Sequence, residues 1–236
     1  MRTLDFEFML SCVEPIVTKG VPIALLIAVV AFVFGAIIGT CVALIKIYNV
    51  PVLKQICVAY ISIFRGTPLM VQILLAYYGI PILINNICYI NNWDFDINEV
   101  PTLVFLFVVY SLNAGSYMAE SIRAAILSIG KGQIEAGYSI GMSTPMVFWR
   151  IIVPQAIRVA IPTLGNSFIS LTKESSLAFV VSVPDVMGQA KIIAGRTTRF
   201  FEAYIVAAIV YWLICCVCEI LLRVFEKRAR KFERRN

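Results

Sequence analysis

Two stretches of the chain carry polar side chains at helical spacing within otherwise apolar sequence. Asn113, Tyr117 and Glu120 recur at i, i+4 and i+7, which places them on one face of a helix. A second stretch repeats the pattern at i, i+3, i+7 and i+10, with Thr163, Asn166, Ser170 and Lys173. Such groups can replace the hydration shell of a polar or charged solute inside an apolar layer. The two faces therefore predict a polar path through the protein.

Some of these charged groups have structural alternatives. Glu120 lies three residues before Arg123, so the two could simply form an ion pair at a helix end. Lys173 and Glu174 are neighbours and cannot share one helix face. At least one of them could bond to the break in its own helix or to another subunit.

The chain lacks residues that most catalytic and metal sites require. It contains no histidine, which excludes a Ser/His/Asp or Cys/His arrangement. Its seven cysteines are an odd number with no histidine to complete a zinc site, so we expect no metal and no disulfide framework. No G-x-x-x-x-G-K-[ST] phosphate loop is present. We therefore expect a chain that is not an enzyme, binds no cofactor and hydrolyses no ATP itself.

The elements that carry the polar faces are expected to be membrane helices. Hydrophobic residues make up 60% of the sequence and charged residues only 14%, which is too apolar for a soluble domain. A bilayer core of roughly 30 Å needs about 20 apolar residues per helix. Hydropathy places five spans at about 21–45, 66–87, 101–122, 157–182 and 203–224. We expect one all-α integral membrane domain over 1–236.

The segment 51–64 is also apolar but is expected to be an interfacial helix. Pro51 precedes it, and the sequence from Arg65 to Pro68 separates it from the second span. Arg65 and Gln72 form a thinner third polar stripe at this point. Arg65 could instead anchor the start of the second span at the membrane interface.

The distribution of lysine and arginine predicts how the chain crosses the membrane. The loops that alternate onto one side hold most of these residues, and the tail over 223–236 is strongly basic. Because cytoplasmic loops carry the excess of Lys and Arg, the N-terminus is expected outside and the C-terminus in the cytoplasm. The formal charge of +6 thus reports orientation in the bilayer and implies no nucleic-acid partner.

A polar segment over 131–155 interrupts the apolar sequence on the predicted cytoplasmic side. Residues 131–140 read as a short helix, Gly141 suits the left-handed residue that ends it, and Ser143 suits the N-cap of a second helix. This predicts a helix-turn-helix bracket, which would expose three large apolar side chains: Met146, Phe148 and Trp149. Such a patch indicates either a partner interface or a surface that lies on the membrane.

At the bracket the chain resembles the membrane subunits of ATP-binding cassette (ABC) importers. Their cytoplasmic signature runs E-A-A-x3-G-x9-I-x-L-P, and the matching residues here are Glu135, Ala136, Gly137, Gly141, Ile151, Val153 and Pro154. Gly137 replaces the second alanine and Val153 replaces leucine. The resemblance implies that the bracket forms coupling helices that dock in a groove of a separate ATPase subunit. The residues it would use are Glu135, Ala136, Gly137, Gly141, Met146, Phe148, Trp149 and Pro154.

Three further stretches look like the polar amino acid permeases of the histidine, glutamine and arginine type. They are FRGTPLMVQ (64–72), YMAESIRAAILSIGKGQ (117–133) and LTKESSLAFVV (171–181). The last departs from the family form L-K-D-T-S-L, which leaves the substrate open, and two phrases at 176–179 and 187–190 resemble cystine importers. The resemblance implies the type I ABC importer permease fold, in a bacterial cell membrane.

The resemblance also implies partners and a cargo. A second permease would complete the path, an ABC ATPase would hold ATP and Mg²⁺, and an external binding protein would deliver a polar amino acid. A zwitterion needs a cation or donors at its carboxylate and an anion or acceptors at its ammonium. Lys173 and Asn166 could meet the carboxylate, and Glu120 or Glu174 the ammonium. The expected path residues are Asn113, Tyr117, Glu120, Asn166, Ser170, Lys173 and Glu174.

Closure of the ATPase dimer would move the brackets and switch the path between inward and outward access. The alternative from a different class is a secondary transporter driven by an ion gradient, in which Glu120, Lys173 and Glu174 would be proton or ion sites. Secondary transporters usually show internal repeats, and none is seen in this sequence. A membrane scaffold or sensor is a third class, but it gives no reason for the polar stripes.

Overall fold

A computed structural model describes residues 4–231, and all regular structure in this range is helical. The elements in chain order are α1 (Phe6–Pro15), η1 (Ile16–Gly20), α2 (Val21–Ile47), α3 (Leu53–Gly66), α4 (Leu69–Asn91), η2 (Ile97–Glu99), α5 (Thr102–Leu127), α6 (Lys131–Ser139), α7 (Thr144–Val147), η3 (Phe148–Ile152), α8 (Val153–Glu174), η4 (Ser175–Val181), α9 (Val186–Thr197) and α10 (Phe200–Lys231). Five helical segments within this range are long and apolar enough to cross a membrane: Phe6–Ile47, Leu69–Asn91, Thr102–Leu127, Thr144–Val181 and Phe200–Arg228. The all-α fold and the five candidate spans predicted from the sequence are confirmed.

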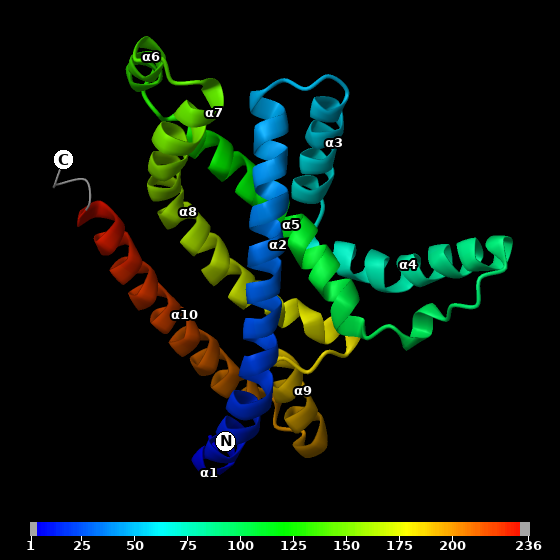
Figure 1. Cartoon of the computed structure of the whole chain (residues 1–236). Helices are drawn as coiled ribbons and strands as arrows, with labels where there is room; N and C mark the ends of the chain where they lie inside the picture. Colours follow the sequence, from blue (N-terminus) through cyan, green and yellow to red (C-terminus); the bar gives the residue numbers. More distant parts are fainter. Residues whose placement is uncertain (1–3, 232–236) are drawn as a thin grey trace.

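α2 and α5 pack together at the centre of the molecule (Figure 1). α8 and α10 lie on one side of α2, and α3 and α4 lie on the other. α6 and α7 lie together at one end, where α2 ends and α8 begins, whereas α1 and α9 lie at the opposite end. The two helices that carry the predicted polar faces, α5 and α8, therefore both lead toward α6 and α7.

Some element boundaries differ from the predicted ones. The first helical segment begins at Phe6 and not near 21, because the π-helical turn Ile16–Gly20 carries the helix past Pro15 and Pro22. The fourth span changes from α-helix to 3-10 helix at Ser175. These non-α turns leave no clear mark in hydropathy, which is why the sequence did not predict them.

A separate helix over 51–64 is present as α3, which runs back alongside α2 (Figure 1), while its place at the membrane interface stays a prediction. It ends at Gly66, and Pro68 stands in an extended conformation at the N-cap of α4. The basic tail predicted over 223–236 begins within α10, and residues 232–236 lie outside the described residues.

Small residues let the backbones of α2 and α5 approach each other closely. A Cβ atom at Gly35 would lie 2.8 Å from the Cβ of Ala114, and one at Gly39 would lie 3.0 Å from the backbone nitrogen of Ala119. In these positions a larger side chain would have to push α5 away. The central contact of the fold therefore depends on Gly35 and Gly39.

Replacing Gly39 by leucine is expected to destabilise the protein by about 1–3 kcal/mol, because the added carbons overpack this interface. The matched control is Gly79→Leu on α4, where no atom lies within 4 Å of an added Cβ. Thermal unfolding in detergent should show a lower midpoint for the first variant only. Equal midpoints for the two variants would contradict the packing described.

Asp185 joins α9 to α10 at the end of the molecule opposite α6. Its side chain accepts hydrogen bonds from the Gly188 backbone N–H at 2.9 Å and from the Tyr211 hydroxyl at 2.6 Å. The side chain is fully buried. This burial raises the pKa of the Asp185 carboxyl, although its hydrogen bonds act in the opposite direction.

The protein is expected to lose stability, relative to an Asp185→Asn variant, as the pH rises above the ordinary aspartate pKa of about 4. A raised pKa means that the folded protein holds this proton more tightly than the unfolded chain does. The contribution of Asp185 to folding stability is therefore fully present below the ordinary pKa of aspartate. It is lost as the pH rises through the pKa that the carboxyl has in the folded protein. Asparagine keeps an oxygen for the Gly188 N–H but cannot ionise. If the unfolding midpoints of the wild type and of Asp185→Asn change with pH in the same way, the raised pKa is contradicted.

Candidate functional site

The bracket predicted over 131–155 is formed by α6, α7 and η3, and it projects at one end of the molecule (Figure 1). Gly141 follows α6 with a φ of +79°, the left-handed conformation that the sequence predicted. Ser143 occupies the N-cap position of α7, but its side chain makes no capping hydrogen bond. The helix-turn-helix is confirmed, and η3 joins it to α8 without a break.

Gly137 packs the two arms of the bracket together. It is buried, and a Cβ atom on it would lie 2.8 Å from the Cδ1 of Ile151 and 3.1 Å from the Cγ2 of Val147. The glycine that replaces the second alanine of the signature thus lets α6 lie close to η3. The side-chain amide of Gln155 also donates to the amide oxygen of Gln133 at 2.5 Å, which joins α6 to α8.

Most predicted coupling residues lie on the surface. The exposed ones are Glu135, Ala136, Gly141, Met146, Trp149 and Pro154, whereas Gly137 is buried and Phe148 is half-buried. Phe148 and Trp149 pack edge to face with ring centroids 5.5 Å apart, and both border an apolar cavity beside α2 and α5. Met146 does not line that cavity. The exposed surface of the bracket therefore consists mainly of α6, the Gly141 turn, Met146 and Trp149.

A polar cavity of about 330 Å³ lies between α5 and α8. Its lining residues are Asn113, Ala114, Tyr117, Thr163, Asn166, Ser167, Ser170, Leu171 and Glu174. It brings together five of the seven residues predicted for the path, namely Asn113, Tyr117, Asn166, Ser170 and Glu174. The cavity can therefore offer amide, hydroxyl and carboxyl groups to one small solute.

Several of the lining side chains are available to bind a solute, Asn166 and Ser170 among them. Asn166 and Ser170 make no side-chain hydrogen bond to any residue within 4–231. Asn113, in contrast, donates to the amide oxygen of Gln72 at 3.0 Å. The Arg65 guanidinium lies 5.0 Å from the centre of the Tyr117 ring. Arg65 and Gln72, the third polar stripe of the sequence, thus contact Tyr117 and Asn113 of the first stripe beside the cavity.

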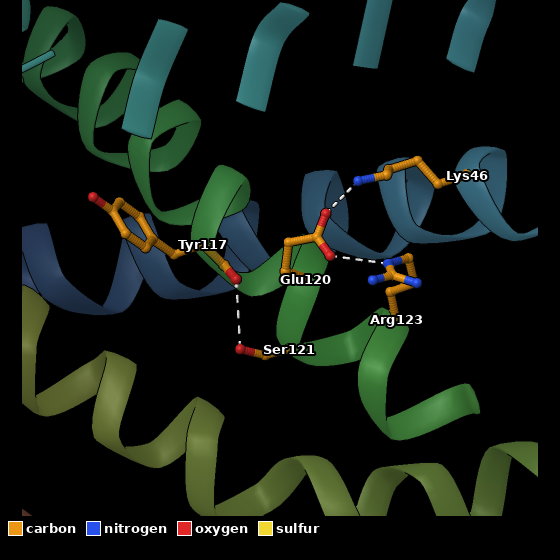
Figure 2. A network of polar contacts seen from close by, with 5 residues as sticks. All are labelled: Lys46, Tyr117, Glu120, Ser121 and Arg123. Atoms are coloured by element: carbon orange, nitrogen blue, oxygen red, sulfur yellow. Dashed lines mark hydrogen bonds and ion pairs between the residues drawn. The ribbon is translucent and has the colours of Figure 1, made fainter. Parts of the chain in front are cut away.

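The other two predicted path residues are not among the lining residues. Glu120 accepts hydrogen bonds from Lys46 of α2 and from Arg123, the latter at 2.9 Å (Figure 2). The ion pair with Arg123 that the sequence allowed is therefore present, and Lys46 adds a link between α2 and α5. Lys173 is exposed and has no ion-pair partner among residues 4–231.

Sequence reasoning missed a tyrosine that holds the end of α8. Tyr110 of α5 is fully buried, and its hydroxyl donates to the backbone oxygen of Glu174 at 2.7 Å. This bond satisfies a carbonyl at the point where α8 gives way to η4. Tyr110 lies three residues before Asn113, so helical spacing was the available signal.

Comparison with known proteins places the chain in a family. Residues 20–231 match the family model described as binding-protein-dependent transport system inner membrane component. The chain belongs to this family. Its helical, multi-span structure is that of an inner membrane component, and the resemblance that the bracket motif indicated is confirmed.

Relatives of this inner membrane component are amino-acid permeases. YxeN of Bacillus subtilis, a probable amino-acid permease protein, is 41% identical over 231 residues, which cover 98% of each chain. TcyL of the same organism, an L-cystine transport system permease protein, is 38% identical over 94% of this chain and 90% of its own. Both relatives are thus named as permease proteins, one for amino acids and one for L-cystine, as the sequence motifs predicted.

Solved structures share the fold. The crystal structure of an amino acid ABC transporter with histidines contains a chain that matches with a TM-score of 0.81 and 34% identity, over 96% of this chain and 100% of that one. A chain of the inward-facing MetNI methionine ABC transporter matches with a TM-score of 0.73 at 16% identity, over 91% and 96% of the two chains. The second likeness shows the fold alone. Together they confirm the type I importer permease fold.

Proposed function

We propose that this protein is the permease subunit of an ATP-driven importer of polar amino acids, with the whole chain 1–236 as one domain. A second permease, identical or homologous, completes the path, and separate ABC ATPase subunits hold ATP and Mg²⁺. An extracytoplasmic binding protein delivers the amino acid. In a bacterial cell membrane the N-terminus lies outside, and the bracket and the basic tail lie in the cytoplasm.

The polar cavity between α5 and α8 carries this proposal. Amide and hydroxyl groups without partners are unfavourable in lipid, so their presence inside two candidate spans favours a wet path. Asn166 and Ser170 supply donors for a substrate carboxylate, and Glu174 supplies an acceptor for its ammonium. Lys173 and Glu120 remain proposed path residues that act beyond the cavity. The names of the relatives support an amino acid, and cystine is one zwitterion among those to test.

The connections of the bracket support coupling. α6 follows α5 after residues 128–130, and η3 continues directly into α8. A force on the bracket therefore reaches both helices that line the cavity. Closure of the ATPase dimer would draw two brackets together and switch the cavity between outward and inward access.

Reconstitution with and without the ATPase tests the proposal. The purified complex in liposomes, with the binding protein added, should take up one of arginine, glutamine, histidine, glutamate or cystine only when ATP is supplied. Competition among the five defines the substrate. Uptake by this chain alone under an ion gradient would contradict the proposal and support a secondary transporter.

A further inference from the structure

We propose that an anionic phospholipid binds in an apolar groove between α2, α8 and α10. A cavity of about 430 Å³ lies there, and on α8 its lining runs from Ile161 to Ile169. The facing walls are Phe32 of α2 and, on α10, Leu221 and Phe225. Almost all of this lining is aliphatic or aromatic, which suits an acyl chain and offers nothing to a polar solute.

The groove and the polar cavity lie on opposite faces of α8. Asn166 and Ser170 line the polar cavity, whereas Gly165 and Phe168 line the groove. If the proposed function holds, a second permease completes the path and must therefore face the side of α8 that carries the polar cavity. The groove is therefore left facing the bilayer.

The groove together with Arg158 spans about one leaflet. From Arg158, three residues before the first lining residue Ile161, to the last lining residue Ile169, α8 advances by roughly 16 Å at 1.5 Å per residue. This is about half of a bilayer core that is roughly 30 Å thick. An acyl chain in the groove would thus place its headgroup next to Arg158.

Two arginines stand in register with the groove at this end. Arg158 lies three residues before Ile161 on α8, and Arg228 lies three residues after Phe225 on α10, so each shares the face of a lining residue. The first turns of α8 and the last turns of α10 lie at the same end of the molecule (Figure 1). Two cations at the mouth of an apolar groove complement a lipid phosphate.

Arg223, which is also on α10, differs from these two arginines in its ion pairing. Arg223 donates to Glu219 at 3.0 Å and points along another face of α10. Neither Arg158 nor Arg228 has an ion-pair partner among residues 4–231. Their charges are therefore available for an anionic headgroup, whereas that of Arg223 is already balanced.

Native mass spectrometry of the purified permease–ATPase complex tests whether the site prefers an anionic headgroup. Phosphatidylglycerol and phosphatidylcholine with identical acyl chains are added in turn, and the wild type should prefer phosphatidylglycerol. We expect Arg158→Gln and Arg228→Gln each to weaken phosphatidylglycerol binding roughly fivefold. The control Arg223→Gln should change it less than about twofold. Equal binding of the two lipids, or a preference that survives the double variant, would overturn the proposal.

The position of the acyl chain is tested separately on α10. Leu221→Trp fills the groove and should reduce binding of both lipids, whereas Ile220→Trp, on an outward face and 60% exposed, should not. A photoreactive residue at Leu221 should label added lipid. Loss of binding in both tryptophan variants, or a crosslink from 221 to a second permease chain, would overturn the assignment. The amino-acid uptake assay is independent of these readouts, so failure of the lipid site leaves the proposed function intact.

Discussion

Replacing Asn166 by leucine is expected to lower amino-acid uptake by at least about tenfold, because it removes a hydrogen-bonding amide from the polar cavity. Asn166 lines the cavity and makes no side-chain hydrogen bond within residues 4–231, so its loss leaves no partner unpaired in the protein. The fold should therefore be retained while the substrate loses a contact. Initial rates of ATP-dependent uptake in proteoliposomes measure the effect.

The matched control is Ile169→Leu, three residues further along α8 and on the groove side. It changes neither volume nor polarity, so uptake should stay within about twofold of the wild type. Asn166→Ser, which keeps a small polar group, should recover part of the rate. If Asn166→Leu transports as well as Ile169→Leu does, the cavity is not the path.

Replacing Gly141 by tryptophan is expected to separate the permease from its ATPase and to lower uptake by at least roughly thirtyfold, as loss of an interface hot spot would. No atom lies within 4 Å of a Cβ built at Gly141, so the ring would project into solvent and not into the chain itself. It would then occupy the space that a docked ATPase needs. Co-purification in mild detergent and ATP-dependent uptake measure the result.

Two controls distinguish a blocked surface from a strained backbone. Gly141→Ala imposes the same φ of +79° on a residue with a Cβ, at about 1–2 kcal/mol, but adds almost no bulk. Gly195→Trp adds the same ring on α9, at a position where no atom lies within 4 Å of the new Cβ. Both controls should keep the ATPase. Equal loss in Gly141→Ala would assign the effect to the turn, and retention in Gly141→Trp would show that the bracket is not the docking surface.

Helical spacing predicted which faces of α5 and α8 are polar, but not where along those faces the cavity ends. Tyr117 lines the cavity, whereas Glu120, nearly one turn further on, meets Lys46 at the end of α2. Lys173 lies ten residues after Thr163 and is therefore turned by roughly 80° from that residue. Which group meets which along the axis depends on the other helices, and a single sequence does not contain that information.

Local backbone signals were more informative in the bracket. Gly141 has the left-handed φ that its place after a short helix predicted. The reason for Gly137, in contrast, became visible only with Ile151 and Val147 packed against it. The close approach of α2 and α5 at Gly35 and Gly39 likewise needed the tertiary structure, because the sequence does not say which helix a glycine faces.

Photo-crosslinking from position 146 tests most directly whether the bracket binds the ATPase. Met146 is 40% exposed and lies on the arm of the bracket that leads into α8. With a photoreactive residue in its place, we expect the assembled transporter to yield one crosslinked product that contains the permease and the ATPase. Crosslinks from this position to lipid alone would contradict the coupling role, and crosslinks to the extracytoplasmic binding protein would contradict the predicted orientation as well.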